Sequence, residues 1–292
     1  MNYQWYPGHM TKARRMMQEH IKLIDVVIEL LDARIPLSSR NPDIDELSRG
    51  KSRVVLLNKS DLADPVRNQG WMEHFRRQGA YALEVNSKSG AGVKAIQGLV
   101  QEACKEKRLR DRKRGIVNRP VRAMVAGIPN VGKSTFINSF SGRACTKTGN
   151  RPGVTKGKQW IRLNPSLELL DTPGILWPKF EDPQAGRNLA FIGSMNDEVI
   201  FLDQLALELI LFLKDAYPEA LALRYELAMK EDSAKLLEEI AVRRKLIGKG
   251  ETPDTAKAAG VVLDDFRSGK LGRITIESAP AQAAVRAATG IS

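Results

Sequence analysis

The sequence predicts a mostly parallel α/β sheet domain with helices on both faces, followed by a small all-helical domain. Two observations support this fold class. Six short apolar runs alternate with helical patterns over the first 180 residues, and strand signals nearly vanish beyond Pro183. Nearly continuous apolar runs with helices between them are typical of parallel strands buried on both sides. We therefore expect two domains, over residues 1–180 and 185–292.

The expected elements follow from apolar periodicity and β-rich composition. Strands are expected at Val26–Leu31, Arg53–Leu57, Ala82–Val85, Arg122–Ala126, Gln159–Leu163 and Leu167–Leu170. Helices of the first domain are expected at Met10–Ile24, Pro42–Arg49, Val66–Gln78, Val93–Arg110 and Lys133–Phe140. Helices of the second domain are expected at Asp197–Ala216, Pro218–Leu227, Ala234–Ile247, Pro253–Gly269 and Ala281–Thr289.

Positive charge is concentrated in the first part of the chain. The 292 residues include 46 Lys and Arg against 34 Asp and Glu, a formal net charge of +12. Residues 1–184 hold 32 of these basic and 18 of these acidic residues. Nine basic residues fall between Lys105 and Arg122 alone. This excess favours a polyanionic partner, and a merely soluble cationic protein is the alternative.

No segment indicates secretion or a membrane partner. The N-terminus lacks the basic start and apolar core of a signal peptide. The most apolar stretch, Val199–Leu213, is too short to span a bilayer and contains two acidic residues. Cys104 and Cys145 have neither metal-ligand spacing nor the density of a disulfide framework. We expect a cytoplasmic protein.

Residues Gly127–Ser134 read G-I-P-N-V-G-K-S, which matches the phosphate-binding pattern G-x-x-x-x-G-K-[ST] between an expected strand and an expected helix. In such a loop the backbone N–H groups cradle phosphates, the lysine reaches the β- and γ-phosphates, and the serine hydroxyl coordinates Mg²⁺. We assign phosphate binding to Asn130, Val131, Gly132, Lys133, Ser134, Thr135 and, from the downstream turn, Gly174.

Two downstream segments are expected to complete the phosphate site. The sequence D-T-P-G places Asp171 at the end of an apolar strand, where it would be a second Mg²⁺ contact. The Gly174 N–H is expected to meet the γ-phosphate of a nucleoside triphosphate, a contact absent with the diphosphate. In the loop before it, Thr155 is assigned to Mg²⁺ and catalysis, with Thr146, Thr148 or a purely structural threonine as alternatives.

A guanine-reading pattern precedes the phosphate-binding loop. The apolar run ending at Leu57 is followed by N-K-S-D, formed by Asn58, Lys59 and Asp61 around Ser60. A carboxylate at Asp61 accepts the N1–H and N2–H of guanine together, and adenine offers no such pair of donors. The segment Asn86–Ser87–Lys88 follows another strand, where backbone N–H groups are expected to meet the guanine O6.

This order of motifs resembles the circularly permuted GTPases of the ribosome biogenesis GTPase A family. Trp5–Met10 (W-Y-P-G-H-M) and Asp32–Pro36 (D-A-R-I-P) also resemble that family, and the match extends over essentially the whole chain. The resemblance implies a switch that binds GTP and GDP and hydrolyses GTP in late assembly of the large ribosomal subunit. The implied partners are a large-subunit precursor and its rRNA, with no DNA expected, and the resemblance assigns the rRNA contact to the helical domain, residues 185–292.

The alternative is a nucleotide-gated RNA-binding scaffold with negligible turnover, since Ile175 and Leu176 stand where Ras-like enzymes carry a water-orienting glutamine. A small-molecule kinase or an ATPase would leave Asn58–Asp61 unexplained. We expect a low intrinsic rate that the ribosomal subunit stimulates. His9 is the leading candidate to position water, against a structural or RNA-facing role. Asn130 is implied to hold K⁺, a second cofactor beside Mg²⁺.

Overall fold

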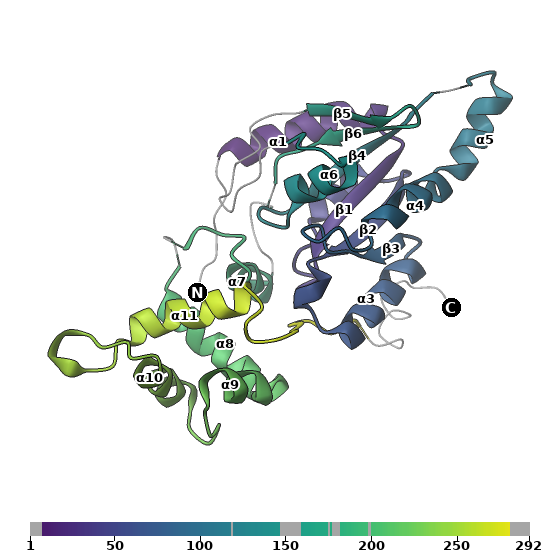
Figure 1. Cartoon of the computed structure of the whole chain (residues 1–292). Helices are drawn as coiled ribbons and strands as arrows, with labels where there is room; N and C mark the ends of the chain where they lie inside the picture. Colours follow the sequence, from purple (N-terminus) through teal and green to yellow (C-terminus); the bar gives the residue numbers. More distant parts are fainter. Residues whose placement is uncertain are drawn as a thin grey trace. The chain divides into compact units, whose positions relative to one another are not determined.

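The computed structural model describes residues 8–117, 119–146, 159–174, 176, 182–197 and 200–280. The chain divides into two compact units (Figure 1). The helical unit runs from Glu181 to Ile274, and the sheet unit contains Gln4–Phe180 together with the segment from Thr275 onward. The sequence-based domains placed that last segment with the helical domain, whereas the structure groups it with the sheet.

The sheet unit contains a six-stranded sheet of order β3-β2-β1-β4-β6-β5. All neighbouring strands are parallel except β5 and β6, which pair antiparallel. The expected α/β fold class is confirmed, and each strand lies within one residue of its expected bounds. The strands are β1 (Val26–Asp32), β2 (Ser52–Asn58), β3 (Tyr81–Glu84), β4 (Val121–Gly127), β5 (Gln159–Asn164) and β6 (Leu167–Asp171).

Six α-helices accompany the sheet in the described part of the sheet unit: α1 (Gly8–His20), α2 (Pro42–Leu47), α3 (Pro65–Arg77), α4 (Ile96–Ala103), α5 (Lys105–Lys113) and α6 (Lys133–Ser141). α3 and α4 pack against β2 and β3, and α6 packs against β4 and β6. The expected helix Val93–Arg110 is interrupted at Cys104, whose backbone is not helical (φ −102°, ψ 6°). Beyond this break α5 has no buried residue, and it extends away from the sheet (Figure 1).

The strand order reverses between β1 and β4. From β1 the chain proceeds to β2 and β3 on one side, and from β4 it proceeds to β6 and β5 on the other side. Ligands of open α/β sheets bind outside the carboxyl ends of the strands at such a reversal. Here that point lies beside Asp32, which ends β1, and Gly127, which ends β4.

The helical unit contains α7 (Pro183–Phe191), α8 (Leu202–Ala216), α9 (Pro218–Tyr225), α10 (Ser233–Arg243) and α11 (Thr255–Arg267). α8 packs against α10 and α11, and its apolar face is fully buried. The expected helix Asp197–Ala216 begins only at Leu202, and α7 was not expected. The expected helix Ala281–Thr289 lies outside the described residues. No helix in the described part of the chain is long and apolar enough to cross a membrane.

Asp265 of α11 ties this unit together through a buried carboxylate. It accepts hydrogen bonds from Arg224 Nε (2.8 Å) and the Tyr225 hydroxyl (3.0 Å), and Lys270 Nζ lies 3.2 Å away. Burial alone would raise the pKa of Asp265, but these donors outweigh it and hold the pKa below its usual range. The stability from this carboxylate is therefore present above the usual Asp pKa and lost as pH falls through the lower folded value.

We expect Asp265→Asn to lower the free energy of unfolding at pH 7 by about 2 kcal/mol, because hydrogen bonds to a charged acceptor are lost. The difference from the unmodified protein should shrink as the pH falls below about 4, because the carboxylate of the unfolded chain binds a proton there while the native carboxylate, with its lower pKa, stays ionised until the pH falls further. Urea unfolding followed by circular dichroism from pH 3 to 7 measures both effects. Asp264→Asn is the matched control, because its side chain is exposed. A pH-independent difference would contradict this account.

Candidate functional site

The phosphate-binding loop joins β4 to α6, and two of its glycines are required by close approach. Gly127 has φ +153°, and a Cβ there would lie 2.6 Å from the Leu30 carbonyl oxygen. Gly132 has φ +97°, and a Cβ there would lie 2.6 Å from Asn58 Nδ2. The loop therefore packs directly against β1 and against the N-K-S-D turn, and side chains at these positions would force them apart.

Lys133, the loop lysine, is buried at the first turn of α6. Its Nζ donates to the carbonyl oxygens of Gly127 (3.0 Å) and Ile128 (2.8 Å). Burial lowers the pKa of Lys133 to about 8, and the nearby Asp171 charge opposes this effect. The ammonium is thus held inside the curl of the loop, where the sequence predicts the phosphates of a nucleotide.

Asp171 ends β6 and is 1% exposed. Among the described residues no hydrogen bond of normal geometry reaches either of its carboxylate oxygens, although the neighbouring Thr172 N–H is close enough to lower its pKa. Burial is the largest effect and raises the pKa of Asp171 to about 6, against the opposing effects of the Lys133 charge and this N–H. A buried carboxylate with so little hydrogen bonding is costly unless a cation compensates it. Together with the Ser134 hydroxyl at the start of α6, this oxygen set fits Mg²⁺, which prefers oxygen ligands.

Gly174 lies directly against the phosphate-binding loop. A Cβ at this position would fall 2.9 Å from Lys133 Nζ and 2.9 Å from both the N and Cα atoms of Pro129. The preceding Thr172 anchors the turn, because its buried hydroxyl donates to the Val125 carbonyl oxygen at 2.7 Å. The D-T-P-G turn therefore lies directly beside the phosphate-binding loop, and the contact of the Gly174 N–H with a phosphate stays a prediction.

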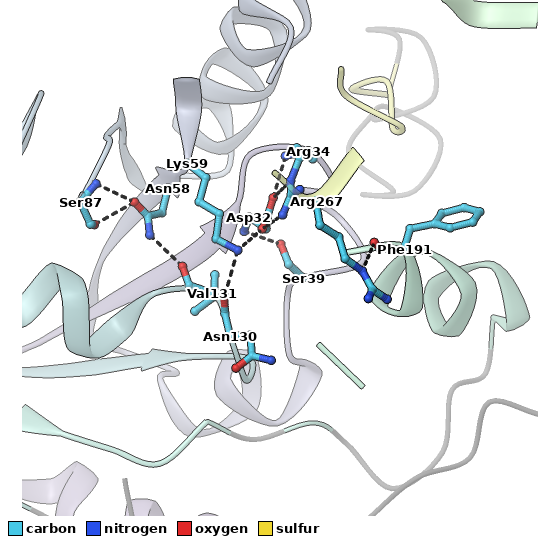
Figure 2. A network of polar contacts seen from close by, with 10 residues as sticks. All are labelled: Asp32, Arg34, Ser39, Asn58, Lys59, Ser87, Asn130, Val131, Phe191 and Arg267. Carbon is cyan, nitrogen blue, oxygen red and sulfur yellow. Dashed lines mark hydrogen bonds and ion pairs between the residues drawn. The ribbon is translucent and has the colours of Figure 1, made fainter. Parts of the chain in front are cut away.

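Asn58 connects the guanine-reading motif to the phosphate-binding loop (Figure 2). Its Nδ2 donates to the Val131 carbonyl oxygen at 2.7 Å. Its Oδ1 accepts from Ser87 N (3.0 Å) and Ser87 Oγ (2.8 Å). The side chain is 2% exposed, so it acts as a buried link between three loops. Its two partners, Ser87 and Val131, lie 29 and 73 positions away in the sequence.

Lys59 follows in the left-handed region (φ 59°) and makes a second link. Its Nζ donates to the Asn130 carbonyl oxygen at 2.9 Å and lies 2.9 Å from Asp32 Oδ2 (Figure 2). Burial lowers the pKa of Lys59, against the opposing effect of the Asp32 charge. Asn130 is itself left-handed (φ 57°), a conformation that asparagine tolerates better than most residues.

The predicted base-reading groups lie around these links. Asp61 is exposed at the start of the turn Ser60–Leu62, so its carboxylate is accessible to a ligand. Asn86 Oδ1 accepts from the backbone N–H groups of Lys88 (2.9 Å) and Ser89 (3.0 Å), which fixes the curvature of the next loop. Lys88 is exposed. The assignment of these residues to guanine stays a prediction.

Some of the predicted site residues lie outside the part of the chain that the structure describes. Thr155, Thr148 and Ile175 lie outside the described residues, and His9 falls within α1 but its side chain is not described. Thr146, one alternative to Thr155, donates from its hydroxyl to the Ser134 carbonyl oxygen at 3.1 Å. It is thereby attached to α6. Thr135 is half-buried on the first turn of the same helix.

Comparison with known proteins identifies the family. The chain is 48% identical to ribosome biogenesis GTPase A of Priestia megaterium, over 95% of this chain and 97% of that protein. It is 45% identical to ribosome biogenesis GTPase A of Bacillus pumilus, over 95% of this chain and 99% of that one. The chain belongs to the ribosome biogenesis GTPase A family. It is a GTP-binding GTPase of ribosome biogenesis, and GTPases of this kind use Mg²⁺.

Two further comparisons agree with this membership in the ribosome biogenesis GTPase A family. Residues 122–244 match the family model described as 50S ribosome-binding GTPase. The crystal structure of GNP-bound YlqF from T. maritima matches with a TM-score of 0.65 and 27% identity, covering 92% of this chain and 98% of that one. The family model begins at β4, so the N-K-S-D motif precedes the matched region, as expected for a permuted order.

The sequence analysis assigned no role to Asp32 and Arg34. Asp32 is fully buried beside Asn58 in the β1–β2 register, and its carboxylate binds both Arg34 and Lys59. The available signal was its place at the end of an apolar strand next to the strand that ends in N-K-S-D. Thr275 and Glu277 were also missed, because nothing in their local sequence indicates a contact more than 200 residues away.

Proposed function

We propose that this chain is a GTP-hydrolysing switch that acts late in assembly of the large ribosomal subunit and contacts the rRNA of its precursor. The main support is the double link from N-K-S-D to the phosphate-binding loop, through Asn58 and Lys59. This link supports a single site that combines a guanine-reading carboxylate with a phosphate cradle. Family membership supplies the ribosomal context, and the names of the matched family and relatives refer to ribosome biogenesis and 50S binding.

In this proposal Asn130–Thr135 bind and orient the phosphates of GTP, and the Gly174 N–H contacts the γ-phosphate. Ser134, Asp171 and Thr155 would hold Mg²⁺, which would supply positive charge beside the phosphates. Asp61, Lys59 and the Asn86–Lys88 loop read the base. Leu176 is fully buried and apolar, so it cannot orient water. We assign that task to His9, with the ribosomal subunit accelerating a slow intrinsic reaction.

The deciding experiment measures phosphate release from GTP with and without purified large ribosomal subunits, with ATP as the control nucleotide. Stimulation that is specific to GTP and reduced in His9→Ala supports the proposal. Tight GTP binding without phosphate release, even with subunits present, would favour the nucleotide-gated scaffold instead.

α5 is the element we assign to rRNA backbone contact. Six of its nine residues are basic, and none is buried. Arg108, Arg110, Arg112 and Lys113 are exposed, and among the described residues no carboxylate forms an ion pair with them. A helix that buries no face and carries unpaired positive charge suits a polyanion better than a protein core. A groove of about 650 Å³ beside it is lined by further basic residues, including Lys51 and Arg53.

We expect the triple change of Arg108, Arg110 and Arg112 to glutamine to weaken subunit binding and to flatten its salt dependence. Loss of three phosphate contacts should reduce the log–log salt slope by about 2. Sedimentation with large subunits at several salt concentrations measures both quantities. The matched control replaces three dispersed exposed residues, Lys22, Arg49 and Lys94, by glutamine. Equal effects of the two triple variants would show that net charge acts and α5 does not.

We also propose that K⁺ binds beside the phosphates with help from Asn130, adding positive charge where the transition state accumulates negative charge. Replacing K⁺ by Na⁺ at matched ionic strength should slow hydrolysis about 10-fold, or about 1.4 kcal/mol in barrier. Asn130→Gly keeps the left-handed backbone (φ 57°) but removes the side-chain oxygen, so it should abolish this difference. Equal turnover of the unmodified protein in the two salts would exclude the K⁺ site.

A further inference from the structure

The turn Asp32–Pro36 makes no predicted contact with nucleotide, yet it carries a fully buried ion pair at the point where the strand order reverses. Asp32 and Arg34 are 0% and 1% exposed. Arg34 Nε donates to Asp32 Oδ1 and Arg34 Nη2 donates to Asp32 Oδ2, both at 2.8 Å. A buried ion pair seldom stabilises a fold more than apolar residues of similar volume would. The pair is therefore a candidate for positioning other groups.

The carboxylate of Asp32 holds a third group. Oδ2 lies 2.9 Å from Lys59 Nζ, and the same ammonium donates to the Asn130 carbonyl oxygen at 2.9 Å (Figure 2). Lys59 is thus fixed between β1 and the phosphate-binding loop. Asp61 lies two residues further on, in the turn that Lys59 begins. Because its ammonium is held at two points, Lys59 is a fixed residue at the start of the turn that carries the base-reading carboxylate.

A second segment fixes the Asp32–Pro36 turn from outside. We name it the C-terminal clamp, residues Thr275–Glu277. Its Ile276 N–H donates to the Arg34 carbonyl oxygen at 2.8 Å, and its Thr275 hydroxyl donates to the Ala33 carbonyl oxygen at 3.3 Å. The Glu277 carboxylate accepts from the backbone N–H groups of Leu37 (2.6 Å) and Ser38 (3.0 Å).

The clamp also binds the segment that follows the guanine-reading turn. Thr275 Oγ1 accepts from the Asp64 N–H at 3.0 Å, at the N-cap of α3. Arg67 Nη1 donates to the Thr275 carbonyl oxygen at 2.5 Å, and Trp71 Nε1 donates to the Glu277 carbonyl oxygen at 3.1 Å. Thr275 is fully buried. The clamp therefore joins the segments on both sides of the base-reading motif, at Ala33–Ser38 and at Asp64–Trp71.

We propose that Asp32 is a positioning residue for guanine-nucleotide binding, acting through Lys59, and that the C-terminal clamp holds it in place. The proposal rests on the assignment of Lys59 and Asp61 to the guanine site made above. Asp32 touches no reacting group, so its loss should change affinity and leave the chemical step unchanged.

The test is steady-state GTP hydrolysis and GDP release by Asp32→Asn in the full-length protein. The amide keeps an acceptor for Arg34 but loses the charge that holds Lys59. We expect KM for GTP and the GDP dissociation rate to rise on the order of 10-fold, with kcat within about twofold. Glu29→Gln is the matched control, because Glu29 lies on the same strand, is 1% exposed and pairs with Arg53 instead. It should leave KM unchanged.

Two further variants separate positioning from general destabilisation. Glu277→Ala removes the clamp's carboxylate and leaves its other acceptors in place, so it should raise KM about threefold with little change in the melting temperature. In a Lys59→Met background, Asp32→Asn should cause no additional rise in KM, because its effect passes through the lysine. An additive effect in that background, or unchanged KM in both Asp32→Asn and Glu277→Ala, would overturn the proposal.

The assignment of Asp61 to the guanine base is tested separately from the positioning role of Asp32. If Asp61→Asn leaves the preference for guanine intact, the base-reading assignment itself is wrong. If Asp61→Asn alters base preference but Asp32→Asn behaves like Glu29→Gln, only the positioning role fails.

Discussion

Gly174→Ala is expected to lower the rate of GTP hydrolysis on the order of 100-fold, because it displaces a backbone donor from developing negative charge. The added Cβ would lie 2.9 Å from Lys133 Nζ and from two backbone atoms of Pro129. The lysine can move, but the proline backbone at the start of the loop cannot. The D-T-P-G turn must therefore shift away from the phosphate-binding loop.

The same substitution should change GDP affinity by less than about threefold, since the Gly174 contact is proposed for the γ-phosphate alone. Single-turnover hydrolysis and the dissociation rate of a fluorescent GDP analogue measure the two effects. Gly98→Ala is the matched control, because a Cβ there meets nothing within 4 Å. A parallel loss of GDP binding would show that the turn supports the loop itself and has no selective role with GTP.

Much of the sheet was predictable from local sequence, because buried parallel strands carry long apolar runs. β2 shows this well, since every residue from Val54 to Asn58 is buried. The antiparallel direction of β5 follows from its short connection to β6. Only Pro165 and Ser166 lie between the two strands, whereas a parallel pair needs a crossover of about a dozen residues or more.

The helices were less regular than their sequence patterns. The predicted helix ran on to Arg110, but the apolar pattern of α4 does not continue into α5, where Leu109 is the one apolar residue and is exposed. The buried stripe ends with Val100 and Cys104, and the chain turns out into solvent. α7 was missed because its start depends on local capping and not on periodicity. Asp182 accepts a hydrogen bond from the Gln184 N–H, and Pro183 occupies the first turn.

The candidate site was predictable as a set of motifs at strand ends, whereas the links between motifs were not. Asn58 and Lys59 bind carbonyl groups more than 70 residues away, and Glu277 binds N–H groups 239 and 240 residues away. Such pairings arise only when strands are ordered in the sheet. The strand order of β1, β2 and β4 brings these segments together, and no local pattern encodes it.

Asp61→Asn is expected to exchange the base preference of the site. Guanine presents the N1–H and an exocyclic N2–H, and both are donors to the carboxylate. An amide offers one acceptor and one donor group, so its NH₂ would face the guanine N2–H₂, donor against donor. Affinity for GTP should fall on the order of 100-fold, because one charge-assisted bond is lost and a donor is left unpaired.

Xanthine carries a carbonyl oxygen in place of the exocyclic amine and keeps the N1–H, so it complements the amide. The Asp61→Asn protein should therefore hydrolyse XTP with a kcat near that of the unmodified protein on GTP. KM for GTP, XTP and ATP measured with both proteins tests this exchange. Asp64→Asn is the control, because Asp64 caps α3 in the same segment. Loss of all three nucleotides together would mean that Asp61 supports the turn, whereas the exchange would place its carboxylate on the base.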